Sequence, residues 1–355
     1  MRRAALVLCG SLLATVLATG PALACGGLVS PNGTIALVRT TTLAAYHDGV
    51  EHYVTGFEFA GGGAAFGSIV PLPGVPTRLI RGGDWTLQRL EIAVNPPILE
   101  AAGAAAPTAG RLDKAVVLQR KKIDALDLTI LKGGGFAVGR WATQHGFQLT
   151  PDAPEVLDFY ARRSPIFMAV EFNAARAKAR GERIGDSIPI HVVIPTSRPW
   201  VPLRILALGA KPTQRIDADV FLLNDRAPAM LPVPRGVPEL GPAASGLNVQ
   251  VSESATPFLL GDLRSDRGMS WLPRKGMWLT YLQVRAAASQ LRYDLAIDPS
   301  GRGQPSPVDA GLAPPVHGSV PDPGHSLWAV WIGAALLAIV FALALRGRRA
   351  GRMAV

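Results

Sequence analysis

The sequence predicts a mainly β (α+β) protein with antiparallel, sandwich-like sheets, two short helices around residues 135–163 and one C-terminal transmembrane helix. Three observations lead to this fold class. Apolar residues between positions 25 and 298 recur mostly at every second position, which is typical of strands that are buried on one face. Helical periodicity is confined to two short stretches, and one long uncharged run lies near the C-terminus.

The N-terminus has the features of a secretory signal peptide. Arg2 and Arg3 precede an apolar stretch, and Ala22-Leu23-Ala24 places small residues where a signal peptidase cleaves. The stretch is too short to cross a membrane, and Gly20-Pro21 interrupts it near the expected cleavage point. We therefore expect an exported mature chain that begins with Cys25-Gly26-Gly27.

Alternating apolar residues predict at least five strands in the exported part. The clearest alternation spans residues 291–297, where every second residue is large and apolar. Pro189 and Pro195 lack the N–H group that a sheet ladder needs, so the strand expected at residues 188–194 should lie at a sheet edge or in a short central run. The other strands are expected at residues 126–130, 168–172, 188–194 and 218–222.

Two short helices are expected between the strands. Residues 138–145 carry Val, Trp, Ala and His at i, i+3, i+4 and i+7, and Gly146 follows where a helix would end. A second helix should begin at Asp152, because Glu155 stands at capping-box spacing and an apolar run follows.

The run from Leu327 to Leu345 is expected to cross a lipid bilayer once. It is 19 residues long without a charge, and as a helix it would span about 28 Å. Trp328 and Trp331 lie at one end, and an arginine cluster begins at Arg346. The positive-inside rule then predicts a single-pass protein of the cytoplasmic membrane, with the C-terminus in the cytoplasm and the large domain outside or periplasmic.

Two proline-rich segments interrupt the pattern. Residues 227–246 read as a long surface loop or a subdomain seam, and residues 299–326 as a disordered stalk. The predicted order is therefore a signal peptide (1–24), an exported β-rich domain (25–298), a Pro/Gly-rich stalk (299–326), a transmembrane helix (327–345) and a cytoplasmic basic tail (346–355).

Charge and cysteine content exclude some functions. The formal net charge is +10, but two arginines belong to the signal peptide and four to the tail, which leaves +4 for the exported part. That value does not indicate a nucleic-acid partner. The basic run from Arg176 to Arg183 is a solvated face or, alternatively, a contact for anionic lipid headgroups or envelope polymers.

Cys25 is the one cysteine of the expected mature chain, so an internal disulfide is not expected. Two alternatives remain at the two ends of the mature chain. Cys25 could be lipidated after cleavage, although Ala22-Leu23-Ala24 lacks the usual large aliphatic residue. Val320-Pro321-Asp322-Pro323, ahead of the transmembrane run and the arginines, is similar to the sorting signals that lead to cleavage of an anchor.

Several short motifs resemble an uncharacterised bacterial family. They include Cys25-Gly26-Gly27, the segment from Ser68 to Pro76, Trp141 to Phe147, Tyr160 with Phe167, and Trp200 to Leu208. The resemblance is to a domain of unknown function in exported proteins that start with Cys-Gly-Gly and often carry a C-terminal membrane anchor. It covers most of residues 25 to 298 and implies no activity. This chain has Leu28-Val29 where the family pattern has a second cysteine.

The sharpest polar cluster is the segment from His47 to His52. Asp48-Gly49 between alternating residues predicts a two-residue hairpin turn that pairs His47 with Val50. His47 and His52 then share one face and Glu51 lies on the other. A zinc site needs three or four ligands and this spacing supplies two, so the segment is interpreted as a polar hairpin tip, with His47 and His52 as weak metal candidates.

No catalytic motif or cofactor-binding motif is found. Gly61-Gly62-Gly63 and Gly133-Gly134-Gly135 match no phosphate-binding loop and are interpreted as turns, and no nucleophile motif has a base at a suitable spacing. We therefore expect no catalytic residues and no cofactor. The predicted function is a membrane-anchored cell-envelope protein that serves as a non-catalytic binding or structural module for an envelope protein or polymer. The alternative is an envelope hydrolase or metal-dependent enzyme whose site assembles from distant residues.

Overall fold

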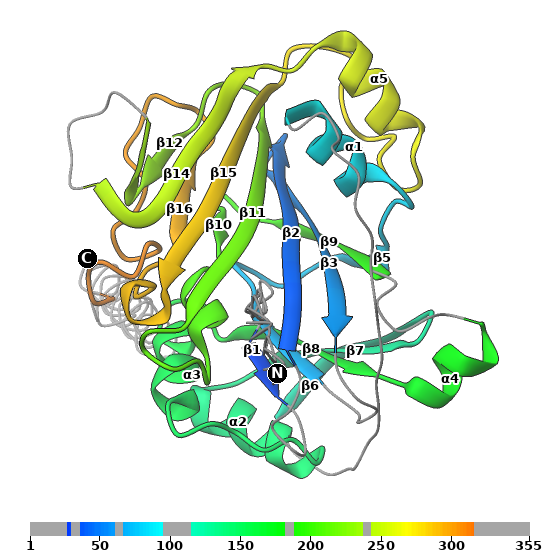
Figure 1. The fold of residues 1–355 in the computed structure, drawn as a ribbon, viewed down its shortest axis with the longest axis vertical. Coiled ribbons are helices and arrows are strands. Elements are labelled where there is room, and N and C mark those ends of the chain that lie inside the picture. The colour runs from blue at the N-terminus through cyan, green and yellow to red at the C-terminus, as the bar shows by residue number, and fades with distance from the viewer. Residues whose placement is uncertain are drawn as a thin grey trace, which may run out of the picture. The chain divides into compact units, whose positions relative to one another are not determined.

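The computed structural model describes residues 27–29, 36–60, 67–94, 115–181, 188–236 and 243–315. Within these ranges the fold is mainly β, with three sheets and five α-helices (Figure 1). The described residues up to Ala313 belong to one compact unit. The helices are α1 (Thr86–Val94), α2 (Gly135–Gln144), α3 (Ala153–Ala161), α4 (Ala174–Ala179) and α5 (Pro257–Ser265).

The largest sheet has eight strands in the order β13-β14-β15-β11-β2-β3-β9-β5. Neighbours pair antiparallel except β11 with β2 and β13 with β14, which run parallel. In the order of the sheet, the strand bounds are Val233–Arg235, Ala243–Ser254, Trp278–Ala287, Arg215–Asn224, Ala36–His47, Val50–Ala60, Ile188–Pro195 and Arg78–Arg81.

Two smaller sheets are antiparallel throughout. The five-stranded sheet has the order β1-β4-β8-β7-β6, with bounds Gly27–Val29, Gly67–Pro71, Ile166–Phe172, Leu126–Lys132 and Val116–Ile123. The three-stranded sheet has the order β10-β16-β12, with bounds Trp200–Val201, Leu295–Asp298 and Ala229–Leu231.

Apolar side chains join these sheets and helices into layers. One cluster of buried residues combines the eight-stranded sheet with both smaller sheets, through residues such as Leu222, Met168 and Ile297. A second packs the other face of the five-stranded sheet on α2 and α3. A third packs the other face of the eight-stranded sheet, including Phe221, on α1 and α5, including Leu260. Helices therefore cover the outer faces of both large sheets (Figure 1).

The predicted fold class needs correction in three respects. The large sheet is mixed rather than antiparallel, because β2 and β11 pair in parallel although they are far apart in the sequence. Five helices are present rather than two in the described ranges, since α1, α4 and α5 join the two expected ones. Among the described residues, no helix is long and apolar enough to cross a membrane, and the predicted transmembrane segment Leu327 to Leu345 lies outside them.

The predicted hairpin is confirmed in its register. Asp48 and Gly49 form the turn with positive φ angles of 48° and 79°, which is the backbone that Asp-Gly favours between two strands. His47 pairs with Val50, and Ala45 with His52. The interpretation as a polar tip is wrong for Glu51, which is fully buried.

Three other segments differ from the expected organisation. The strand expected from Leu291 begins only at Leu295, because the N–H of Asp294 donates to the carbonyl of Ala310 instead of a neighbouring strand. The region 227–246 contributes β12 and β13 to two different sheets. Residues 299–313, in the expected stalk, belong to the compact unit, where Ala310 is fully buried.

Candidate functional site

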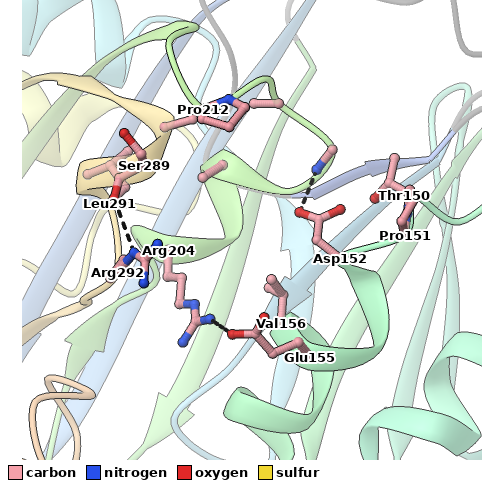
Figure 2. Close-up of a pocket in the computed structure, with 14 residues that line it drawn as sticks. Thr150, Pro151, Asp152, Glu155, Val156, Arg204, Pro212, Ser289, Leu291 and Arg292 are labelled. Atoms are coloured by element: carbon pink, nitrogen blue, oxygen red, sulfur yellow. Dashed lines mark hydrogen bonds and ion pairs between the residues drawn. The ribbon is translucent and has the colours of Figure 1, made fainter.

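A cavity of about 460 Å³ opens beside α3 (Figure 2). Its walls come from the start of α3, from the 3-10 helix η1 (Arg204–Ala207) with the loop after it, and from the 3-10 helix η2 (Ala288–Gln290) with the two residues after it. Cavities of this size accommodate small molecules or short chain segments.

The cavity combines an apolar floor with charges of both signs. Val156, Ala288 and Leu291 line it and are buried. Four charged side chains surround them, and Figure 2 shows Asp152 just before α3, Glu155 on α3, and two arginines. They are Asp152, Glu155, Arg204 and Arg292.

Each of the charged side chains has a local partner. An Asp152 carboxylate oxygen accepts a hydrogen bond from the N–H of Gly209 at 3.0 Å. Glu155 and Arg204 form an ion pair. Arg292 donates through Nε to the carbonyl of Ser289 at 3.2 Å. Because that bond uses Nε alone, the terminal nitrogens of the exposed Arg292 are available to a ligand.

Arg204 is fixed more firmly than Arg292. Its guanidinium carbon lies 4.2 Å from the ring centroid of Phe159, in a cation–π contact. Only 17% of the Arg204 side chain is exposed, against 74% for its partner Glu155. Arg204 therefore belongs to a rigid wall of the cavity.

A buried ionic network holds that wall in place. Asp294 is 0% exposed and forms an ion pair with Arg163, whose side chain is 2% exposed. Asp294 Oδ1 also accepts from the N–H groups of Leu203 at 2.8 Å and Arg204 at 2.9 Å, and from the hydroxyl of Tyr160 at 2.7 Å. These bonds fix the first turn of η1 against α3, and so they fix the position of Arg204.

Aromatic rings complete this network. The guanidinium carbon of Arg163 lies 4.0 Å from the ring centroid of Phe159, 4.9 Å from that of Tyr160 and 5.2 Å from that of Trp200. Burial, with the nearby charge of Asp294, raises the pKa of the Tyr160 hydroxyl well above its usual value. Tyr160 therefore remains a hydrogen-bond donor to Asp294 at all physiological pH values.

The two histidines predicted as metal candidates have different hydrogen-bond partners. His47 pairs with Asp225, with 2.6 Å between Nδ1 and the carboxylate. His52 instead meets His191 of β9, with 2.9 Å between Nδ1 of His52 and Nε2 of His191. Trp271 stacks on His52 with 3.5 Å between ring centroids. Within the described ranges, no group of three His, Cys, Asp or Glu side chains could hold a metal ion.

The His52–His191 pair is uncharged at neutral pH. Burial, and then the charges of His191, His47 and Arg78, lower the pKa of His52 to about 3. Burial, and then Arg78, lower the pKa of His191 to about 4. One imidazole can therefore donate to the other. The sequence held one signal for this pair, because His191 is a polar residue inside an otherwise apolar strand.

Replacing His191 by Gln should make the fold less sensitive to acid. Between pH 6.5 and about 4 the unfolded chain binds a proton that the folded His191 does not, so wild-type stability falls as the pH drops through this range. The wild-type free energy of unfolding should be lower at pH 5 than at pH 7. We expect His191→Gln to make this difference smaller by on the order of 1–2 kcal/mol. Urea unfolding at both pH values measures this difference. Equal losses in the two proteins would contradict the prediction.

Two buried aspartates outside the cavity, Asp219 and Asp266, have structural roles. Asp219 accepts a hydrogen bond from the Tyr281 hydroxyl at 2.5 Å. Asp266 accepts from the N–H groups of Asp84 and Trp85 and from Thr86, all before or at the start of α1. Burial alone would raise the pKa of Asp266, but these bonds and one from Arg267 lower it.

The glycine and basic segments are also accounted for in part. Gly133 and Gly134 precede α2, which begins at Gly135. In the basic run, Arg176 binds the carboxylate of Asp127 and the carbonyl of Asp124. Part of this run is therefore engaged within the protein. Cys25, Gly61-Gly62-Gly63 and both chain termini lie outside the described residues.

Comparison with known proteins identifies a family. The model of the DUF2330 family, described as an uncharacterized protein conserved in bacteria, matches residues 19–227, which is more than half of the chain. The chain belongs to this uncharacterised bacterial family. The match includes the α3 and η1 walls of the cavity and ends before η2. The Cys-Gly-Gly start and export remain predictions.

No curated protein matches the chain. Among solved structures, the crystal structure of baculovirus P35 is similar at 9% identity with a TM-score of 0.39. The match covers 76% of this chain and 98% of that one. A likeness at this level supports no conclusion about the fold or the activity of the present protein.

Proposed function

We propose that the protein is a non-catalytic binding module whose cavity beside α3 takes a peptide-like ligand with charges of both signs. The observation that carries this proposal is the juxtaposition of Asp152 and Arg292 around an apolar floor. An ammonium group can pair with Asp152 and a carboxylate with Arg292, while an aliphatic body covers Leu291.

The fixed wall of the cavity supports binding rather than turnover. Because Asp294 fixes the backbone of Leu203 and Arg204, little ordering is needed when a ligand enters. The described lining contains Asp and Glu as titratable acids but no histidine or cysteine. An aspartate that already binds a backbone N–H is suited to holding a cation rather than accepting a proton.

Tri-alanine with free ends is the probe that tests the proposal. We expect calorimetry to show that tri-alanine with free ends binds the full chain. N-acetylated, C-amidated tri-alanine should not bind. Arg292→Ala should weaken binding about tenfold, equivalent to about 1.4 kcal/mol, because the carboxylate loses a charged donor. Arg302→Ala, at another exposed arginine outside the cavity, is the control and should leave binding unchanged. Equal affinity for free and blocked peptides would reject the charge-based proposal.

We also propose that the module acts outside the cytoplasm, as the sequence features of residues 1–24 predict. An exported binding module would meet proteins or polymers of the envelope. Mass spectrometry of the protein from cells would test this, since export with cleavage leaves Cys25 as the first residue. A mature chain that retains Met1 to Ala24 would reject it.

A further inference from the structure

Glu51 and Asn224 are two of the buried polar side chains on the eight-stranded sheet that form no hydrogen bond with any described residue. Glu51 of β3 is 0% exposed, and neither carboxyl oxygen forms a hydrogen bond with any described residue. Asn224 of β11 is 1% exposed, and its amide oxygen and nitrogen are equally unpaired in the described structure. Buried polar groups nearly always have partners, so two such groups close together are candidates for binding an ion or water.

The register of the sheet places both side chains in one row. Asn224 of β11 pairs with Tyr46 of β2, and Tyr46 pairs with Glu51 of β3. Residues directly opposite each other project from the same face of a sheet. With strands about 4.8 Å apart, the Cα atoms of Glu51 and Asn224 are separated by roughly 10 Å. Tyr46 is the middle residue of the row, so the three side chains are neighbours on one face of the sheet.

The row offers oxygen atoms to such an ion. Glu51 supplies a carboxyl group and Asn224 an amide carbonyl. The hydroxyl of Tyr46 donates to the carbonyl of Thr196 at 3.0 Å, and its oxygen keeps lone pairs for a further contact. Carboxylate, carbonyl and hydroxyl oxygens are ligands of hard cations, which they bind at about 2.3–2.6 Å in the case of Ca²⁺.

The electrostatic surroundings also favour a cation. Burial raises the pKa of Tyr46, and the charges of Glu51, Asp225 and Asp298 raise it further. Three acidic side chains therefore lie near this hydroxyl, and Glu51 contributes negative charge only when its carboxyl group is ionised. Negative potential at an oxygen-rich site attracts positive ions.

We propose that Glu51, Asn224 and Tyr46 form a buried site for a hard cation of the Ca²⁺ type. The site is independent of the cavity beside α3, since none of the three residues lines that cavity. A bound cation would supply the missing partners of both buried side chains. It would also tie together β11, β2 and β3, which form the centre of the sheet.

Binding at this site has a specific chemical signature. Burial raises the pKa of Glu51 to about 8, so without a cation its carboxyl group is protonated at pH 7. A cation that binds the carboxylate must displace this proton, which goes to the buffer. Ca²⁺ uptake at pH 7 should therefore release close to one proton per ion, whereas binding to exposed, already ionised carboxylates releases almost none.

Calorimetry with CaCl₂ on the full chain, after chelator treatment, tests the proposal. In two buffers of different ionisation enthalpy, we expect one site and the release of close to one proton. Glu51→Gln and Asn224→Leu should each weaken Ca²⁺ binding at least tenfold, and Glu51→Gln should abolish proton release. Asp48→Asn, at the exposed tip of the same hairpin, is the control and should bind as the wild type does.

Two results would overturn the proposal. One is that the wild type takes up no Ca²⁺ even at ~10 mM, a concentration at which even the weakest extracellular calcium modules bind the ion. The other is uptake that both variants retain, without proton release, which would place the ion on the surface. Urea unfolding of each variant in chelator-containing buffer separates loss of the site from loss of the fold. Glu51→Gln is expected to fold at least as stably as the wild type.

Discussion

Asp294→Ala is expected to lower the free energy of unfolding by about 3–5 kcal/mol, the typical cost of removing one partner from a buried ion pair. The change would leave the charge of Arg163 buried without its carboxylate. It would also leave the N–H groups of Leu203 and Arg204 and the hydroxyl of Tyr160 without their acceptor. Urea unfolding at pH 7 measures the loss.

A matched control for this variant is Asp217→Ala. Asp217 pairs with Arg215 on the surface, with 34% and 67% of the two side chains exposed. Exposed pairs of this kind contribute up to about 1 kcal/mol, so the control should remain close to the wild type. Asp294→Ala with a loss below about 1 kcal/mol would show that water reaches Arg163, and that the network does not anchor η1.

Glu51→Gln is expected to stabilise the protein in alkaline buffer without cations. Burial raises the pKa of Glu51 from 4.5 to about 8. Between these values the folded chain keeps a proton that the unfolded chain releases, so wild-type stability falls as the pH rises from 4.5 to about 8. The glutamine side chain of the variant does not titrate. The variant should therefore equal the wild type near pH 4 and exceed it at pH 8.5 by on the order of 3 kcal/mol.

Unfolding in urea at pH 4 and pH 8.5, with chelator present, measures this gain. Glu253→Gln, at an exposed position on β14, is the control and should follow the wild type at both pH values. The prediction fails if Glu51→Gln is destabilised equally at both pH values. Such a result would mean that Glu51 stabilises the fold through the shape of its side chain and not through its protonation state.

Local features of the fold could be predicted because neighbouring residues determine them. The Asp48-Gly49 turn defines the register of β2 and β3, and alternating apolar residues mark the strands β7, β8, β9 and β11. Pairing over long distances leaves no such mark. The parallel pairing of β2 with β11 depends on which strands end up adjacent in the folded chain, and apolar periodicity does not encode that choice.

In the candidate sites, too, local arrangements could be predicted from the sequence and long-range contacts could not. His47 and His52 were correctly placed on one face of the hairpin, but the partner of His52 is His191, 139 positions away. Glu51 was placed on the opposite face, which is also correct, and its burial follows only from the second layer of sheets. The cavity beside α3 combines Asp152, Arg204 and Arg292 from three separate segments, and no short motif could have linked them.

Residues 299–313 change how the boundary of the folded unit should be defined. The carbonyl of Asp309 accepts a hydrogen bond from Arg163, and that of Ala310 accepts from the N–H of Asp294. β16, the last strand that the structure describes, therefore ends well before the last residues that the core requires. In genetic terms, a stop codon placed just after β16 would act on the same ionic network as a point mutation at Asp294, although the two lesions lie in different parts of the gene.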